Sequence, residues 1–157
     1  MSAAASTATG ATAMLLCRVS GRACALPLAH VVETMRPLFI ESFAGAPSFV
    51  LGLSRIRGEH VPVIDLGRLL GSPDEASASR FVLLRVGSRC VAARVGAVLG
   101  VGALQDDAAL ALPPLLREAD GPVAALAARD AELLLVLKAA RLLDAASELS
   151  MQEKADA

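Results

Sequence analysis

The feature that most constrains the fold of this chain is an internal duplication. Residues 14–32, MLLCRVSGRACALPLAHVV, resemble residues 81–99, FVLLRVGSRCVAARVGAVL, at an offset of 67 positions. Residues 50–70 resemble residues 123–143 at an offset of 73, with seven identities. The two matches occur in the same order, with a turn signal at the same place in each. We therefore infer a repeated unit of about 60 residues.

The pattern within each unit predicts short strands. Alternating apolar residues precede a Ser-Gly turn at 20–21 and a Gly-Ser turn at 87–88, which predicts a hairpin in each unit, the second with a type II′ turn. Further strand pairs are expected around turns at 57–58 and 130–131. Short strands closed by Gly and Pro turns are typical of small barrels. We expect an all-β fold with short helices, made of two small barrel subdomains related by the duplication.

Two helices and one constrained strand complete the expected elements. Apolar spacing predicts short helices at 66–70 and 139–146, and the second places Ala139, Leu142, Leu143 and Ala146 on one face. Pro62 has no amide hydrogen, so its strand is expected at a sheet edge or at a bulge.

The chain divides into a core domain and two flanking segments. Residues 1–13 read as a disordered Ala/Ser/Thr lead and residues 147–157 as a polar tail. The domain between them, 14–146, is expected to split into halves at about 14–71 and 80–146. Polar or irregular loops are expected at 71–79 and 105–121.

Composition excludes several classes of protein. The 157 residues are 55% hydrophobic, but the longest strictly aliphatic stretch, Leu133–Leu137, is far shorter than the roughly 20 residues of a membrane-spanning helix. The formal net charge is −1 and there is no Trp or Tyr, which disfavours nucleic-acid binding. Three cysteines without CxxC spacing favour a reducing compartment, so we expect a cytoplasmic protein.

Charge is unevenly distributed along the sequence. Residues 14–100 carry ten Arg and six acidic residues, whereas residues 101–157 carry five basic and ten acidic residues, so the stretches have net charges of +4 and −5. Such polarity suits protein docking, although the opposite charges could also meet inside the molecule.

The residues that could carry chemistry do not form a recognisable site. His30 and His60 lack metal-ligand spacing, and Ser54 lacks the second glycine of a nucleophile elbow. The glycines of GAVLGVG, 96–102, match no phosphate-binding motif and favour close strand packing instead. We therefore expect no catalytic residue, no metal and no cofactor.

The acidic residues and cysteines have structural interpretations. Asp65 is expected to cap the helix at 66–70, and the pair at 106–107 to be a solvated loop face. The turn at 20–21 places Cys17 opposite Cys24, at a separation that permits a disulfide. The reducing compartment favours two buried thiols, with Cys90 as a small apolar filler in the second hairpin.

Arginines at strand ends or turns suit recognition better than catalysis. Arg36, Arg55, Arg57 and Arg94 occupy such positions, and the planar guanidinium is a frequent interface anchor. Arg57, just before the turn glycine Gly58, is the strongest candidate.

One block of the sequence resembles a known family. Residues 47–71, PSFVLGLSRIRGEHVPVIDLGRLLG, resemble the signature of the CheW-like family of bacterial chemosensory coupling proteins. The resemblance covers residues 14–146, and its implied fold is two SH3-like five-stranded barrels that share a hydrophobic junction. The matching positions are Pro47, Phe49, Val50, Gly52, Arg57, Gly58, Pro62, Val63, Ile64, Asp65, Leu66 and Gly71.

The resemblance implies a non-enzymatic adaptor for signal transduction. It would hold the regulatory domain of a CheA-type histidine kinase against the cytoplasmic tip of methyl-accepting chemotaxis receptors, and be recruited to membrane-associated receptor arrays without entering the membrane. Carried over by position, the implied receptor-binding residues are Val32, Thr34, Arg36, Arg57 and Gly58. Those implied for kinase docking, or for shaping that region, are Gly52 and Arg55.

Four positions depart from the family pattern: Thr34, Ser54, Arg55 and Ala93. The departures at Thr34, Arg55 and Ala93 leave open an adaptor that binds the receptor but not the kinase. A third possibility is a module that binds a small molecule between the lobes, in a groove lined by small residues such as Ala92, Ala93, Gly96 and Ala97.

Overall fold

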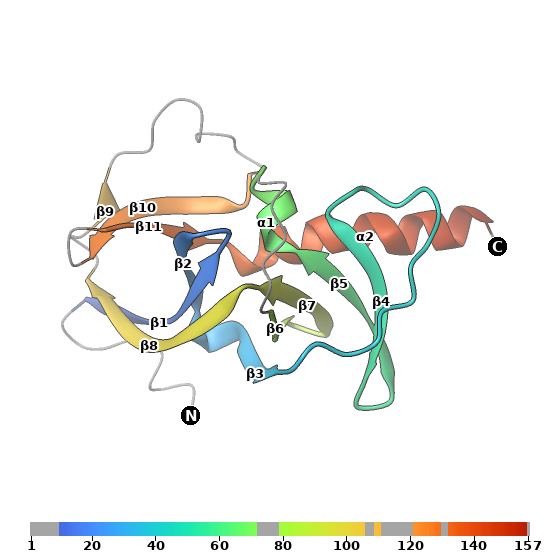
Figure 1. The fold of residues 1–157 in the computed structure, drawn as a ribbon, viewed down its shortest axis with the longest axis horizontal. Helices are drawn as coiled ribbons and strands as arrows, with labels where there is room; N and C mark the ends of the chain where they lie inside the picture. The colour runs from blue at the N-terminus through green and yellow to red at the C-terminus, as the bar shows by residue number, and fades with distance from the viewer. Residues whose placement is uncertain (1–9, 72–78, 106–108, 111–120, 130–131, 157) are drawn as a thin grey trace.

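The computed structural model describes residues 10–71, 79–105, 109–110, 121–129 and 132–156. These residues form two curved β-sheets with a long C-terminal helix lying against them (Figure 1). The elements are β1 (Ala11–Val19), β2 (Arg22–Pro27), the 3-10 helix η2 (Leu28–His30), β3 (Val31–Met35), β4 (Val50–Ile56), β5 (Glu59–Asp65), α1 (Leu66–Leu69), β6 (Arg80–Val86), β7 (Arg89–Val95), β8 (Ala97–Gln105), β9 (Ala109–Leu110), β10 (Val123–Arg129), β11 (Glu132–Leu137) and α2 (Ala139–Asp156).

The expected all-β fold with two subdomains is confirmed. Sheet A has the strand order β8-β1-β2-β11-β10-β9 and sheet B the order β3-β6-β7-β5-β4. Sheet A therefore has one strand more than expected, the two-residue β9. Each sheet contains strands from both repeats, so the sheets do not coincide with the sequence halves 14–71 and 80–146.

The repeats exchange strands reciprocally. The hairpin of the first repeat, β1–β2, pairs with β8 and β11 of the second, while the hairpin β6–β7 pairs with β3 and β5 of the first. In the two parallel ladders, Ala25 lies opposite Val136 in sheet A and Ala92 lies opposite Val63 in sheet B. The offset of 67 carries Ala25 onto Ala92, and the offset of 73 carries Val63 onto Val136. The two ladders therefore have equivalent registers, which confirms the duplication.

The hairpin turns match the sequence prediction. Ser20 and Gly21 have φ of 49° and 80°, and a type I′ turn requires positive φ at both central residues. In the second hairpin, Gly87 has φ of 63°, as the first position of a type II′ turn requires. The first turn places Cys17 directly opposite Cys24, as expected.

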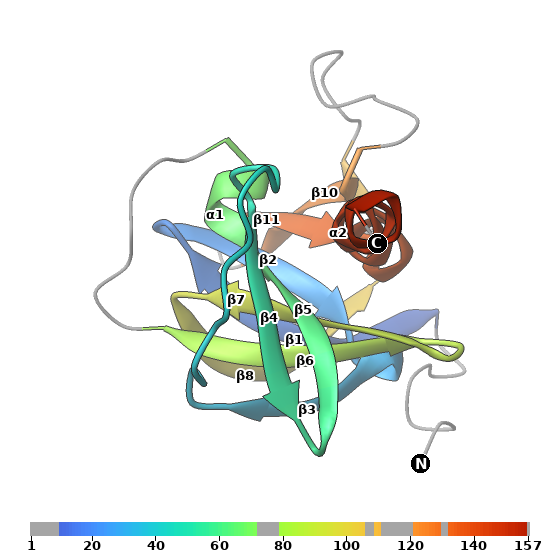
Figure 2. The same ribbon diagram turned by 90° about the vertical axis from the view of Figure 1, so that its right-hand side faces the viewer.

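Sheet B is closed by the segment that follows β3. Glu41 forms an isolated bridge with Leu53 of β4, with backbone N–H···O distances of 2.8 and 2.9 Å. β3 and β4 are the two edges of sheet B, so this segment joins its opposite sides; in Figure 2 it runs beside β4. Sheet A has a corresponding contact, because Leu110 of β9 lies opposite Leu126, the counterpart of Leu53.

Gly52 makes this closure possible. Its φ is 142°, and a Cβ atom at this position would lie 2.1 Å from the Glu41 carbonyl oxygen. Only glycine allows the two backbones to approach so closely.

The largest hydrophobic cluster lies where the sheets meet. It combines residues of sheet A such as Leu26, residues of sheet B such as Ile64, and the buried face of α2. Smaller clusters fill the inside of each curved sheet. The helix buries the four predicted residues, each 3% exposed or less: Ala139, Leu142, Leu143 and Ala146.

Several expected boundaries differ from the structure. β1 begins at Ala11, inside the expected lead, and α2 continues to Asp156, through most of the expected tail. α1 spans Leu66–Leu69, one residue shorter than predicted. The expected features at 72–78, 106–107, 113–114 and 130–131 lie outside the described residues.

Pro62 was predicted to place its strand at a sheet edge or at a bulge, and the strand is not at an edge. β5 lies between β7 and β4. The ladder between β5 and β7 begins only at Val63, one residue after Pro62, so the missing N–H breaks no ladder bond. The bulge of this strand pair lies in β4, between Val50 and Gly52.

Replacing Gly52 with Ala should destabilise the fold strongly. The added Cβ must displace the Glu41 backbone, and overpacking combined with backbone strain should lower the free energy of unfolding by about 3 kcal/mol or more. Urea denaturation followed by circular dichroism measures this change.

Gly45→Ala is the matched control. Gly45 also has positive φ, at 85°, but a Cβ there meets no atom within 4 Å. Its cost should be about 1–2 kcal/mol, from the left-handed backbone alone. Equal losses for the two variants would show that closure over Gly52 is not the tight contact described.

Candidate docking surface

The outer face of β3 presents the first group of predicted residues. Burial alternates along the strand, with Val32 and Thr34 exposed and Glu33 half-buried. Val32 is 43% exposed and lies at a bulge, where the register with β6 shifts between Val31 and Glu33. Such a row of outward-facing side chains is available to a partner.

An ion pair connects β3 with the turn between β4 and β5. The Arg57 Nε donates a 2.6 Å hydrogen bond to Glu33 Oε2. This hydrogen bond lowers the pKa of the Glu33 carboxyl and raises the pKa of the Arg57 guanidinium. Arg57 and Gly58 form the turn, with φ of 53° and 82°. The contact places this turn beside the edge strand β3, with 71% of the Arg57 side chain exposed.

The remaining predicted residues fall into two groups. Arg36, directly after β3, and Arg55, on β4, are exposed, and neither makes an ion pair with any residue that the structure describes. Gly52 is buried, so it shapes the surface from below and does not face a partner. Arg94 is not part of this surface.

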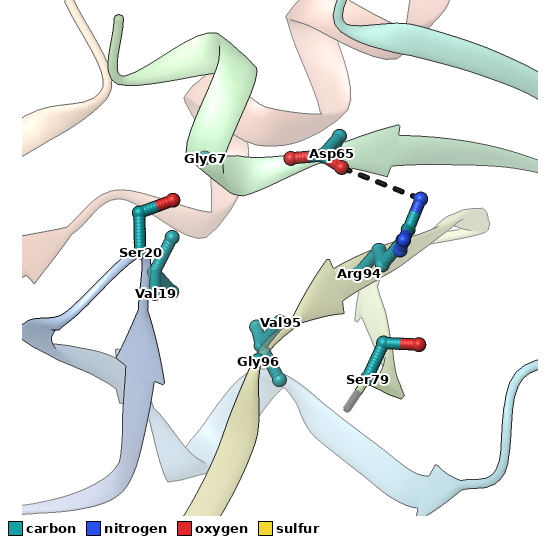
Figure 3. A pocket seen from close by; sticks show the side chains of 8 residues that line it. All are labelled: Val19, Ser20, Asp65, Gly67, Ser79, Arg94, Val95 and Gly96. Atoms are coloured by element: carbon teal, nitrogen blue, oxygen red, sulfur yellow. Dashed lines mark ion pairs between the residues drawn. The ribbon is translucent and has the colours of Figure 1, made fainter. Parts of the chain in front are cut away.

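Arg94 lies instead at the junction between the sheets. Its Nη1 is 3.6 Å from Asp65 Oδ2, and both side chains are largely buried (Figure 3). Asp65 caps α1 as predicted, because its Oδ1 accepts a 3.0 Å hydrogen bond from the Arg68 amide. The pair thus ties the start of α1 to the end of β7.

Two of the four small residues predicted to line a groove for a small molecule lie inside the protein. Ala92 and Ala93 are fully buried. The cavity beside Gly96 has a volume of about 20 Å³, which suffices for about one water molecule. A larger cavity of about 210 Å³ lies elsewhere, between α2 and sheet B, with Cys90 and Leu143 among its lining residues.

The cysteines are free thiols in two environments. Burial raises the pKa of Cys17 to about 12 and that of Cys24 to about 11. Cys90 is half-buried, and the Arg85 Nε donates a 3.4 Å hydrogen bond to its sulfur.

Other candidate residues have structural contacts. His30 Nδ1 lies 3.3 Å from the Arg85 carbonyl oxygen, and His60 is exposed on β5.

In the part of the chain that the structure describes, no group of three or more His, Cys, Asp or Glu could hold a metal ion. No described helix is long and apolar enough to cross a membrane.

Opposite charges from the two ends of the sequence do meet within the molecule. Arg18 pairs with Glu132 at 2.5 Å and Arg89 with Asp144 at 3.1 Å. These pairs are exposed and contribute little to stability. Because the strands are exchanged, the basic and acidic stretches do not correspond to separate lobes.

Comparison with known proteins decides the family. Residues 13–147 match the CheW-like domain family. The chain belongs to that family. The crystal structure of the scaffolding protein TtCheW from Thermoanaerobacter tengcongensis is similar in fold, with a TM-score of 0.72 and 21% sequence identity over 80% of this chain and 88% of TtCheW. A search of curated proteins found no match.

Sequence reasoning missed one prominent part of this CheW-like domain. Phe39 is 84% exposed and Leu38 41% exposed, on the segment that closes sheet B. Ser54 is the only buried polar residue among those described, and its hydroxyl donates a 2.7 Å hydrogen bond to the Phe39 carbonyl oxygen. An apolar run of three residues after Pro37 is the sequence signal, and it would equally suit a buried segment.

Replacing Asp65 with Ala should destabilise this CheW-like domain. The substitution removes the cap of α1 and leaves Arg94 largely buried without its partner, so the free energy of unfolding should fall by about 1–2 kcal/mol or more. Asp65→Asn retains an effective cap and should lose less. Chemical denaturation of both variants tests the assignment, and an unchanged stability for Asp65→Ala would contradict it.

The three thiols should differ in reactivity. At pH 8 about one in a thousand or fewer of the Cys17 and Cys24 thiols is ionised, and the thiolate is the reactive form. Iodoacetamide should therefore label Cys90 well before the other two, as followed by mass spectrometry of peptides. Labelling in denaturant is the control, in which the difference should vanish. Equally fast labelling of Cys17 in the native protein would contradict its burial.

Proposed function

We propose that this CheW-like protein is a non-enzymatic chemosensory adaptor. It couples methyl-accepting receptors to the regulatory domain of a CheA-type histidine kinase, in the cytoplasm, at membrane-associated receptor arrays. The family match over residues 13–147 is the observation that carries this proposal. The similarity in fold to a protein described as a scaffold supports it.

The receptor side of the adaptor is the outer face of β3 together with the adjacent turn. Val32 offers apolar surface, Thr34 and Arg36 offer polar groups, and Arg57 offers a mostly exposed guanidinium. The ion pair with Glu33 orients Arg57 without burying it. Gly58 allows the tight turn that presents it.

The kinase side is the neighbouring part of sheet B. Arg55 is exposed and free of described ion pairs, so a partner can use its charge. Gly52 shapes this region by letting the closing segment approach β4. An adaptor that binds the receptor alone is the second candidate, because Arg55 and Thr34 depart from the family pattern at these positions.

Arg57→Glu should weaken receptor binding and leave the fold intact. The reversed charge repels Glu33 and removes the exposed guanidinium, and charge reversal costs more at an interface than on an open turn. Affinity for a purified receptor cytoplasmic fragment, measured by isothermal titration calorimetry, should fall by at least about tenfold. Thermal melting should show a similar midpoint, because exposed ion pairs contribute little.

Arg22→Glu is the control for this experiment. Arg22 is also exposed, at the start of β2, in sheet A and not in sheet B. It should bind the receptor fragment like the unmodified chain. Equal affinities for all three proteins would overturn the role of Arg57. Separate titrations with the kinase regulatory domain distinguish the coupling adaptor from the one that binds the receptor alone.

A further inference from the structure

The segment that closes sheet B holds an aromatic side chain out in solvent. Phe39 is the most exposed large apolar residue among those described, at 84%, and Leu38 beside it is 41% exposed. The chain contains only four Phe and no Trp or Tyr, so this ring is a large share of its aromatic surface. A clustered exposed apolar patch marks an interaction site more often than a scattered apolar residue does.

The backbone under Phe39 is held in place. The buried hydroxyl of Ser54 donates to the Phe39 carbonyl oxygen, and two backbone hydrogen bonds join Glu41 to Leu53 two residues later. Gly52 provides the room for this close approach. A preorganised aromatic residue loses little conformational entropy when it is buried by a partner, which is a property of interface anchors.

Two exposed arginines lie near Phe39 in the sequence or in the sheet pairing. Arg36 lies three residues before Phe39, and Arg55 follows the serine that binds the Phe39 carbonyl. Arg55 also lies directly opposite His60 in the ladder between β4 and β5. Both arginines are exposed and make no ion pair with a described residue, and Glu41 and Glu59 are exposed acidic residues of the same region. A partner therefore meets guanidinium groups that no described carboxylate neutralises by direct contact.

We propose that the residues around Phe39 form a second protein-docking surface, the Phe39 patch, consisting of Leu38, Phe39, Arg55 and His60. Its occupant is a protein partner that receives the Phe39 ring in an apolar pocket bordered by a carboxylate. The carboxylate pairs with Arg55, which makes no ion pair with a described residue. An adaptor that joins two proteins needs two surfaces, and the patch provides one beyond the contact of Arg57 with the receptor; in this respect the inference rests on the proposed function.

Phe39→Ala is the direct test, with Leu133→Ala as the matched control. Leu133 is 60% exposed on β11 of sheet A, far along the chain from the patch. Both variants should fold normally, because each removes an exposed side chain. The probes are the purified kinase regulatory domain and the receptor cytoplasmic fragment, each titrated separately. We expect Phe39→Ala to weaken binding of the kinase domain by at least about tenfold and Leu133→Ala to leave it unchanged.

A charge variant tests the chemistry of the partner. Arg55→Glu should weaken the same binding at low salt and reduce its dependence on salt concentration, whereas Arg22→Glu, at an exposed arginine of sheet A, should change neither. A tenfold loss for Phe39→Ala without any effect of Arg55→Glu would overturn the carboxylate-bordered pocket.

Three further results would overturn the proposal. If the unmodified chain binds the kinase domain and Phe39→Ala binds equally well, the patch is not the docking surface, while the proposed function stands. If the unmodified chain binds neither probe, the proposed function is wrong and this inference falls with it. If sedimentation of the chain alone shows self-association that Phe39→Ala abolishes, the occupant is a second copy of the chain and not an acidic partner.

Discussion

Two short parallel ladders, β2 with β11 and β7 with β5, hold the repeats of this chain in one fold. Each ladder joins the hairpin of one repeat to the last strand of the other. Without them, β2 and β7 would each expose a free edge, and so would β11 and β5. The large hydrophobic cluster between the sheets also depends on this exchange of strands, because Leu26, Ile64 and α2 contribute to it from different parts of the chain. Neither repeat can therefore complete a sheet or a core on its own.

The exchange also determines where the candidate surface lies. β3 becomes an edge of sheet B because it pairs only with β6 of the other repeat, and β4 becomes the opposite edge. The chain between them must cross from one edge to the other, which it does through the bridge of Glu41 and Leu53 over Gly52. This crossing exposes Phe39 on one side of β4, and the ion pair of Glu33 and Arg57 joins β3 to the β4–β5 turn. The surface is thus a consequence of how the barrel closes.

The sequence was sufficient for features that are encoded locally. Ser20 and Gly21 predicted a hairpin, because a two-residue turn with positive φ suits few residues, and Asp65 predicted a helix cap. The duplication predicted two similar sheets. The exchange between repeats was not predictable from the same pattern. Ala25 and Ala92 are identical and so are Val63 and Val136, so the periodicity is the same whether each hairpin pairs within its own repeat or with the other.

The parts of the site that sequence reasoning missed depend on contacts between distant residues. Glu33 and Arg57 are 24 residues apart, and only the closed sheet brings them together. Phe39 belongs to an apolar run that would equally suit a buried segment, and its exposure follows from the crossing segment. Conversely, Ala92 and Ala93 read as the lining of a groove, but the strand exchange places them in the interior. The roles of Val32, Thr34, Arg36 and Arg55 toward partners stay predictions.

The most direct test of the adaptor function is a reconstitution with vesicles that carry the receptor. The kinase is mixed with these vesicles, with and without the chain, and the kinase in the vesicle pellet is measured after centrifugation. The account predicts that the chain increases the pelleted kinase several-fold and is itself recovered in the pellet. An equal amount of pelleted kinase with and without the chain would contradict it.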